Sequence, residues 1–268
     1  MTTWRAFADE LDRWAQVGAQ ATFWWRDDDA GRVTDPLRRL VDLSHRHQLP
    51  LTAAVVPAWI EPGLVSLLAD CDVAQHGYAH VNHAPAVEKK SEFGAGRVID
   101  DAVEDLRAGR RVLADHFGDG ATVLVPPWNR ISPALAARLP GEGFCGLSTF
   151  AAPGQAAHGD QAPFRVVDTQ IDVIAWRADR GFIGEATALG IAVTHLEARR
   201  ALWATAGERG SPTALPTHPT GLLTHHAVHD AATWHFLEAF LEATCHHPAA
   251  CWLNMQDVFA GSAAESER

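Results

Sequence analysis

Several features that would define a function class are missing from this sequence of 268 residues. Its 22 Lys and Arg residues form no basic run, and a formal net charge of −11 would repel a nucleic-acid backbone or an anionic membrane surface. The cysteines contain no CxxC pair, so they indicate neither a disulfide framework nor a cysteine-based zinc site. We expect them to be buried apolar residues: Cys71, Cys145, Cys245 and Cys251.

Long apolar runs are also missing. No run approaches the about 18 residues that a membrane span requires, and residues 1–10 carry charges where a signal peptide has its apolar core. We therefore expect a cytoplasmic protein. With 47% hydrophobic residues the chain can bury a large core, which favours one domain over residues 1–260 and a disordered tail at 261–268. The pattern leaves the oligomeric state open.

What the sequence does contain is an alternation of strand and helix patterns. Apolar positions at helical spacing predict helices at 3–17, 35–47, 62–69, 97–117, 133–139, 183–207 and 231–245. Asp35-Pro36 supplies an N-cap and a first-turn proline for the second of these. Short apolar runs are typical of parallel strands at 21–26, 51–57, 72–75, 123–126, 144–148, 164–176, 221–226 and 251–253. The alternation predicts a barrel-like (β/α) domain with its site at the carboxyl ends of the strands.

Histidines cluster at two of these strand ends. Of 15 histidines, six fall within residues 76–83 and 225–229. His76 and His80 can point to one side and share a metal ion, and a catalytic zinc site takes three protein ligands and one water. The third ligand is expected from the aspartates at 27–29, which follow the apolar run of residues 21–26. A second carboxylate there could act as general base and a histidine opposite as general acid, which predicts a metal hydrolase.

Four motifs, in this order, resemble those of the NodB-homology polysaccharide deacetylases of carbohydrate esterase family four. They are Arg-Asp-Asp-Asp-Ala-Gly at 26–31, His-Gly-Tyr-Ala-His at 76–80, Pro-Pro-Trp at 126–128 and Leu-Leu-Thr-His at 222–225. The resemblance implies an α/β fold, a distorted (β/α) barrel of about seven parallel strands. It also implies metal-dependent removal of an acetyl group from an N-acetylated sugar or a related glycoconjugate.

By this similarity, the first motif supplies Asp28 as general base and Asp29 as a metal ligand. The triple aspartate also permits the register in which Asp27 is the base and Asp28 the ligand. The second motif supplies His76 and His80 as the other ligands of one divalent ion. Zinc is expected, while cobalt, nickel and iron suit the same donors.

The other motifs complete the implied pocket. The last motif places the general acid at His225. The arginine of the family's third motif is absent, and we expect Arg130 to orient the base in its place, with Arg26 as the alternative. Trp128 and Pro127 are expected to bind substrate, because the apolar face of a sugar ring can stack on an indole.

Further residues are expected to support the site without touching the reacting atoms. Asp172, followed by Trp176, resembles the pair that tunes the catalytic histidine in the family. Asp27 and His226 are expected to form hydrogen bonds around the centre. In contrast, the charged segment at 88–92 is typical of a solvated surface turn, and His47 and His246 lie at predicted helix ends where solvent is expected.

The expected substrate is a small molecule or a glycan, and neither nucleic acid nor a membrane is expected as a partner. Two other functions are compatible with the same motifs. One is an amidohydrolase that opens a non-sugar amide or a cyclic ureide, which the missing arginine favours. The other is a catalytically inactive sugar- or metal-binding protein of the same fold, against which the aspartate pair and His225 argue.

Overall fold

The computed structural model describes residues 2–151, 164–208 and 218–259. Within them, nine strands form one sheet in which every pair of neighbours runs parallel. The order along the sheet is β6-β5-β4-β3-β2-β1-β8-β7, and β9 pairs with the start of β1. The strands are β1 Ala21–Ala30, β2 Thr52–Val55, β3 Asp72–His76, β4 Val123–Val125, β5 Gly146–Leu147, β6 Arg165–Val166, β7 Ile171–Asp172, β8 Thr220–Thr224 and β9 Ala250–Trp252.

One stretch of chain, residues 165–172, brings the two edges of this sheet together. Its first part, β6, pairs with β5, and its last part, β7, pairs with β8. The sheet is thereby curled into the distorted (β/α) barrel that the sequence predicts. The single strand expected within residues 164–176 is instead two strands of two residues each, which is one reason why the count exceeds seven.

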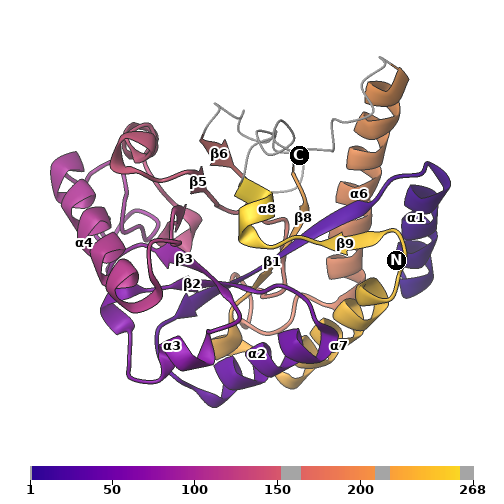
Figure 1. Cartoon of the computed structure of the whole chain (residues 1–268), viewed down its shortest axis with the longest axis horizontal. Coiled ribbons are helices and arrows are strands. Elements are labelled where there is room, and N and C mark those ends of the chain that lie inside the picture. The colour runs from indigo at the N-terminus through magenta and orange to yellow at the C-terminus, as the bar shows by residue number, and fades with distance from the viewer. Residues whose placement is uncertain (1, 152–163, 209–217, 260–268) are drawn as a thin grey trace.

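The longer helices lie around the outside of the barrel (Figure 1). The helix at 35–47 has the predicted bounds, but its N-cap is Thr34, whose hydroxyl accepts a hydrogen bond from the Leu37 N–H. Asp35 is instead in the first turn, where the helix dipole favours a carboxylate. The helices are α1 Trp4–Gln16, α2 Asp35–His47, α3 Leu64–Leu67, α4 Ile99–Phe117, α5 Pro133–Ala136, α6 Glu185–Glu208, α7 Ala231–Cys245 and α8 Met255–Phe259, with 3₁₀ turns η1 Pro57–Trp59, η2 Pro127–Asn129, η3 Leu139–Glu142 and η4 His226–Val228.

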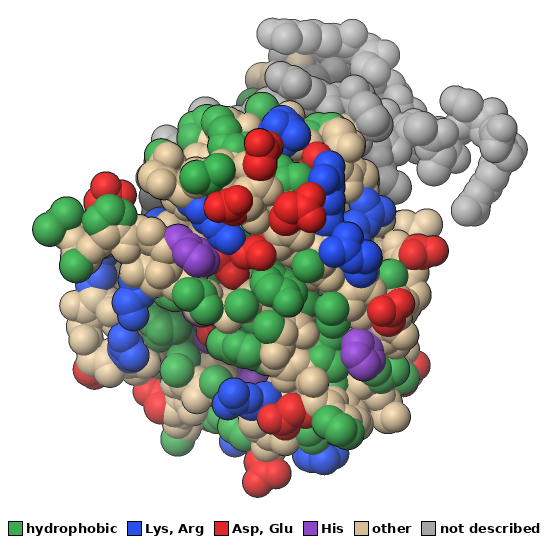
Figure 2. All heavy atoms as spheres, turned by 90° about the vertical axis from the view of Figure 1, so that its left-hand side faces the viewer, with side chains coloured by type: hydrophobic (Ala, Val, Ile, Leu, Met, Phe, Trp, Pro, Cys, Tyr) green, Lys and Arg blue, Asp and Glu red, His purple; other side chains and the backbone are tan. Residues whose placement is uncertain are grey.

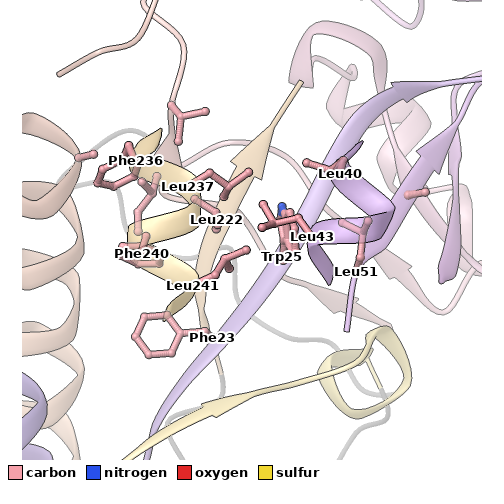
Figure 3. Close-up of a cluster of buried hydrophobic side chains, with 14 of the residues drawn as sticks. Phe23, Trp25, Leu40, Leu43, Leu51, Leu222, Phe236, Leu237, Phe240 and Leu241 are labelled. Carbon is pink, nitrogen blue, oxygen red and sulfur yellow. The ribbon is translucent and has the colours of Figure 1, made fainter. Parts of the chain in front are cut away.

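Strand β1 organises the core on both of its faces. Trp24 lies in the barrel interior with residues of β2, β3, β4 and α8. Phe23 and Trp25 face outward and pack under α2 and α7, as Figure 3 shows. Burial of such a side chain contributes about 1.5–3 kcal/mol relative to exposure. Because side chains alternate along a strand, Arg26 and Asp28 follow Trp24 toward the interior.

No helix of the described ranges has the length and apolar character that a membrane crossing would require. On the face that includes α4, Figure 2 shows acidic and basic side chains interspersed, with no extended area of one sign. Arg107 of α4 contributes to this mixture by donating hydrogen bonds to Glu104 and Glu142. The four cysteines are free and half-buried, so the expectation that they are buried holds only in part.

Candidate active site

The end of β1 carries an irregularity that shapes the mouth of the barrel. Asp27 lies opposite Ala53 and Ala30 lies opposite Val55, so β1 takes three steps where β2 takes two. Asp29 adopts a φ of 70°, which residues other than glycine rarely do. Such a bulge re-aims a side chain. Asp29 therefore departs from the alternation and joins Asp28 at the mouth, beyond the predicted strand end at residue 26.

Asp29, His76 and His80 converge on one point. Asp29 Oδ1 lies 3.2 Å from His76 Nε2 and 3.1 Å from His80 Nε2. Ligands at about 2.0 Å from a tetrahedral zinc ion are about 3.3 Å apart. The Asp29 side chain is 28% exposed, which leaves the point open to solvent. The donor set and its spacing therefore fit one divalent ion.

The charges at this point also favour a cation. Burial alone would raise the pKa of Asp29, but hydrogen bonds with His76 and His80 lower that pKa far below its usual value. Burial would likewise lower the pKa of His76, yet the nearby Asp28 and Asp29 raise it. The aspartates thus favour positive charge at the His76 imidazole, and a metal ion can supply that charge.

Each histidine is held by different neighbours. His76 Nδ1 lies 3.0 Å from the carbonyl oxygen of Val125, to which its N–H can donate, leaving Nε2 free to act as a ligand. His80 has a φ of 56°, and its ring centroid lies 5.3 Å from that of Trp59 and 4.3 Å from that of Trp128. The two imidazoles are therefore fixed by a hydrogen bond in one case and by aromatic packing in the other.

A buried carboxylate supports the loop between the two histidines. Glu92 is fully buried and accepts hydrogen bonds from the N–H groups of Tyr78 and Ala79. A β-carbon on Gly77 would lie 2.0 Å from Glu92 Oε2, so this position requires glycine. The prediction of a solvated turn at 88–92 is wrong for Glu92, because charge alone does not indicate which carboxylate finds backbone donors.

Arg26 holds Asp28 from the same face of the same strand. Its Nε lies 2.8 Å from Asp28 Oδ1 and its Nη2 3.1 Å from Oδ2, a bidentate fork that fixes the carboxylate plane. Arg26 also donates to Ser148 Oγ and Asn129 Oδ1, both at 2.6 Å. The exposed Arg130 instead donates to the carbonyl oxygen of Lys90, so the expectation for Arg130 is corrected. The alternative residue, Arg26, contacts the base position.

His225 faces Asp28 across the mouth, with Nε2 3.8 Å from Asp28 Oδ2. Its ring meets Trp176 edge-on at 4.7 Å. Trp176 in turn donates from Nε1 to Asp172 Oδ2 at 2.8 Å, and burial raises the pKa of Asp172. The sequence-predicted Asp172 and Trp176 thus do approach His225, and Trp176 links the other two residues.

Asp27 belongs to a separate, closed arrangement. Its Oδ2 lies 2.5 Å from His226 Nδ1, and its Oδ1 accepts from the Thr224 hydroxyl and the His226 N–H. Burial alone would raise the pKa of Asp27, but His226 lowers it, and Asp27 in turn raises the pKa of His226. These shifts describe a buried ion pair. Because both Asp27 oxygens are taken, the structure favours Asp28 and Asp29 over the alternative register.

The two proposed substrate contacts differ. Trp128 is half-buried beside His80, whereas Pro127 is buried and its ring atoms lie close to Gly77. Pro127 therefore supports the histidine loop rather than lining the opening.

Sequence reasoning missed Trp59, Asn129 and Ser148 at this site. A signal existed for Trp59, since Val-Pro-Ala-Trp at 56–59 repeats the pattern of Val-Pro-Pro-Trp at 125–128 at another strand end. No sequence signal pointed to Asn129 or Ser148, because polar residues are common in loops.

No family model matches the chain, and no curated protein matches it by sequence. Solved structures do share its fold. A Mycobacterium smegmatis protein classed as a polysaccharide deacetylase matches with a TM-score of 0.63 and 16% identity over 90% of this chain and 89% of its own. A family 4 acetyl xylan esterase from Clostridium thermocellum, in complex with a cobalt ion, has a TM-score of 0.50, 12% identity and coverage of 89% and 90%. A CE4 family pseudoenzyme from Bacillus anthracis has a TM-score of 0.54, 11% identity and coverage of 90% and 66%. The chain has the fold of NodB-type CE4 deacetylases, and that fold includes active and inactive proteins.

Proposed function

We propose that this chain, built on the CE4 fold, is a metal-dependent hydrolase that removes an acetyl group from an N-acetylated sugar or a related glycoconjugate. One observation supports this above all others. Three metal-ligand atoms, those of Asp29, His76 and His80, lie beside a carboxylate fixed by an arginine and opposite a histidine. A binding protein would need the ligands but not the base and acid positions.

The residues divide the chemistry as follows. A divalent ion, when bound, supplies Lewis acidity that makes water easier to deprotonate and polarises an acyl carbonyl. Asp28 takes the proton of the attacking water, and the Arg26 fork holds its carboxylate in a fixed orientation. His225, on the other side of the mouth, gives a proton to the leaving amine. Trp59 and Trp128, which both pack beside His80, offer apolar faces to a sugar ring.

Zinc is the ion we propose for this site, because one carboxylate and two imidazoles suit it. Cobalt, nickel and iron accept comparable donors, and a cobalt ion is present in the Clostridium thermocellum neighbour.

The amidohydrolase is the second candidate, and one specific observation favours it. The arginine that orients the base comes from β1 and reaches Asn129 at the third motif, so the pocket wall near Trp128 differs from the pattern that the family resemblance implies. A changed wall is compatible with a changed acyl substrate, such as a non-sugar amide or a cyclic ureide.

The test measures acetate release from a panel of N-acetylated sugars by metal-free protein reloaded with Zn²⁺ or Co²⁺. We expect turnover in the wild type, and wild-type metal content but no turnover in Asp28→Asn. A His76→Ala, His80→Ala double variant should show no turnover and one metal ion per chain fewer than the wild type. Arg130→Lys is the matched control and should keep full activity, because the exposed Arg130 side chain donates to the carbonyl oxygen of Lys90 and Arg26, not Arg130, holds Asp28.

Three results would contradict the proposal in different ways. Hydrolysis of cyclic ureides or simple amides without acetate release would favour the amidohydrolase. Tight metal or sugar binding with no product from either panel would favour an inactive binding protein. Failure of the wild type to bind Zn²⁺ or Co²⁺ would remove the site itself.

A further inference from the structure

A second group of metal-ligand side chains lies where α2 and α7 end. His47 is the last residue of α2, Cys245 is the last residue of α7, and Glu242 lies one turn earlier on α7. The two helices pack against each other below the sheet (Figure 1). His47 Nδ1 lies 3.4 Å from Glu242 Oε2 and 3.6 Å from Cys245 Sγ. This group shares no residue with the candidate active site.

These separations fit a tetrahedral zinc ion. With Zn–N and Zn–O bonds of about 2.0 Å and a Zn–S bond of about 2.3 Å, ligand pairs lie about 3.3 Å (N and O) and about 3.5 Å (N and S) apart. The observed distances of 3.4 and 3.6 Å match both values. His246 lies next to the group, with Nδ1 3.1 Å from Cys245 Sγ and Nε2 3.4 Å from Glu242 Oε1. A fourth donor is therefore within reach.

The surroundings also favour a cation that can enter and leave. Both helices present their carbonyl ends here, and the partial negative charge at a helix carboxyl end attracts positive charge. The His47 side chain is 9% exposed, which fixes its ring, whereas Glu242 is 59% exposed and opens the group to solvent. His246 is 75% exposed and already contacts Cys245 and Glu242. The expectation that His47 is solvated is therefore wrong, because α7 covers it.

We propose that His47, Glu242 and Cys245 bind a second divalent transition metal of the zinc class, with His246 as the fourth ligand. Thiolate and imidazole donors select zinc, cobalt and nickel over magnesium and calcium. An ion bound here ties α2 to α7 and stabilises the folded state, because it binds only when the two helix ends are together. The site contributes to stability and takes no part in the hydrolysis.

The test uses Co²⁺ as the probe, because a thiolate ligand gives cobalt a near-ultraviolet charge-transfer band that carboxylate and imidazole ligands do not give. The Asp29, His76 and His80 site contains no sulfur, so the band reports on the second site alone. The full chain with His76→Ala and His80→Ala should bind one Co²⁺ and show the band. Adding Cys245→Ser should abolish the band, and Glu242→Gln should weaken Co²⁺ binding at least tenfold.

Cys251→Ser is the matched control, because Cys251 lies on β9 outside the group and should leave the band unchanged. Thermal unfolding with Zn²⁺ supplies an independent measurement. Zn²⁺ should raise the Tm of the His76→Ala, His80→Ala background and not that of the same chain carrying Cys245→Ser. The proposal is overturned if no band forms, if the band survives Cys245→Ser, or if Zn²⁺ shifts both Tm values equally. Because Glu242 is exposed, Glu242→Gln should fold normally even if Cys245→Ser lowers the yield of folded protein. Its Co²⁺ affinity then tests the proposal without the cysteine variant.

Discussion

Two aspartates of β1, only two positions apart, contact histidines in different ways: Asp27 in a closed ion pair and Asp29 in an open ligand set. Asp27 is fully buried and forms an ion pair with His226 in which both carboxylate oxygens have partners. Asp29 is partly exposed, and one of its oxygens faces two imidazole nitrogens at the same time. The same pair of residue types therefore makes a structural contact on one face of the strand and a ligand set at its end.

The difference comes from the backbone and not from the side chains. Alternation directs Asp27 outward toward η4, where the polypeptide encloses it. The bulge and the positive φ of Asp29 turn that residue toward the mouth of the barrel. Removing Asp29 should therefore lower metal content and turnover, whereas removing Asp27 should lower stability. Four substitutions test this contrast, from the largest expected effect to the smallest.

Asp29→Ala should remove the metal ion and most of the turnover. Loss of one of three ligands removes the ion, and the Lewis acidity of such an ion is worth several kcal/mol, which corresponds to about 10³-fold in turnover. Metal content measured by elemental analysis should fall by one ion per chain relative to the wild type, while the stability of the metal-free protein changes little. A variant with the same metal content as the wild type would show that Asp29 is not a ligand.

Asp27→Ala should instead lower stability and leave metal binding intact. It leaves the His226 imidazolium buried without a partner, which typically costs about 3–5 kcal/mol of unfolding free energy. Denaturant unfolding should show this loss, while elemental analysis of the folded fraction shows the metal retained. Equal stability of Asp27→Ala and the wild type would mean that the ion pair contributes nothing.

His229→Gln sharpens the comparison through pH. Burial lowers the pKa of His229 to about 4, and its Nε2 accepts from the His225 N–H. Between pH 6.5 and 4 the unfolded chain binds a proton that the folded chain excludes, so stability falls as the pH falls. The loss at pH 4.5 is about 2–3 kcal/mol.

Glutamine cannot titrate, so His229→Gln should lose that much less stability than the wild type between pH 7 and pH 4.5. Both proteins are unfolded with denaturant in the presence of a chelator, which removes metal binding from the comparison. An identical loss in the two proteins would exclude His229 as the source.

Arg26→Lys tests the support of Asp28, the residue between the two aspartates, which faces the barrel interior. Lysine keeps the charge but cannot form the bidentate fork with Asp28. We expect turnover to fall about tenfold, in line with other residues that orient a metal site, with metal content and KM unchanged. Arg26→Lys turnover equal to that of Arg130→Lys would mean that the fork does not position the base.

The sequence predicted most of the fold but only part of the site. Helix α7 has its predicted bounds, because apolar periodicity and an Asp N-cap define it locally. The convergence of one of three aspartates with His76 and His80 followed from placing motifs at the ends of parallel strands, and the choice of Asp29 followed from the family resemblance. The bulge in β1 did not, because Asp-Asp-Asp contains no signal for where a strand changes register.

Contacts between distant segments were the hardest to predict. Arg26 and Arg130 both lay near a motif in the sequence, and only the alternation along β1 distinguishes them. The expectation of a cytoplasmic location, like the metal and the substrate, stays a prediction.

The pairing of β1 with β8 also has a consequence for how the chain folds during synthesis. Trp25 pairs with Leu222, so the earliest of the described strands needs one of the last of them. At about 5–20 residues per second, roughly 10–40 s pass before β8 emerges. Throughout that time the apolar run containing Trp24 and Trp25 has one edge without its partner. Slow folding is the expected result of pairing a strand made early with one made late.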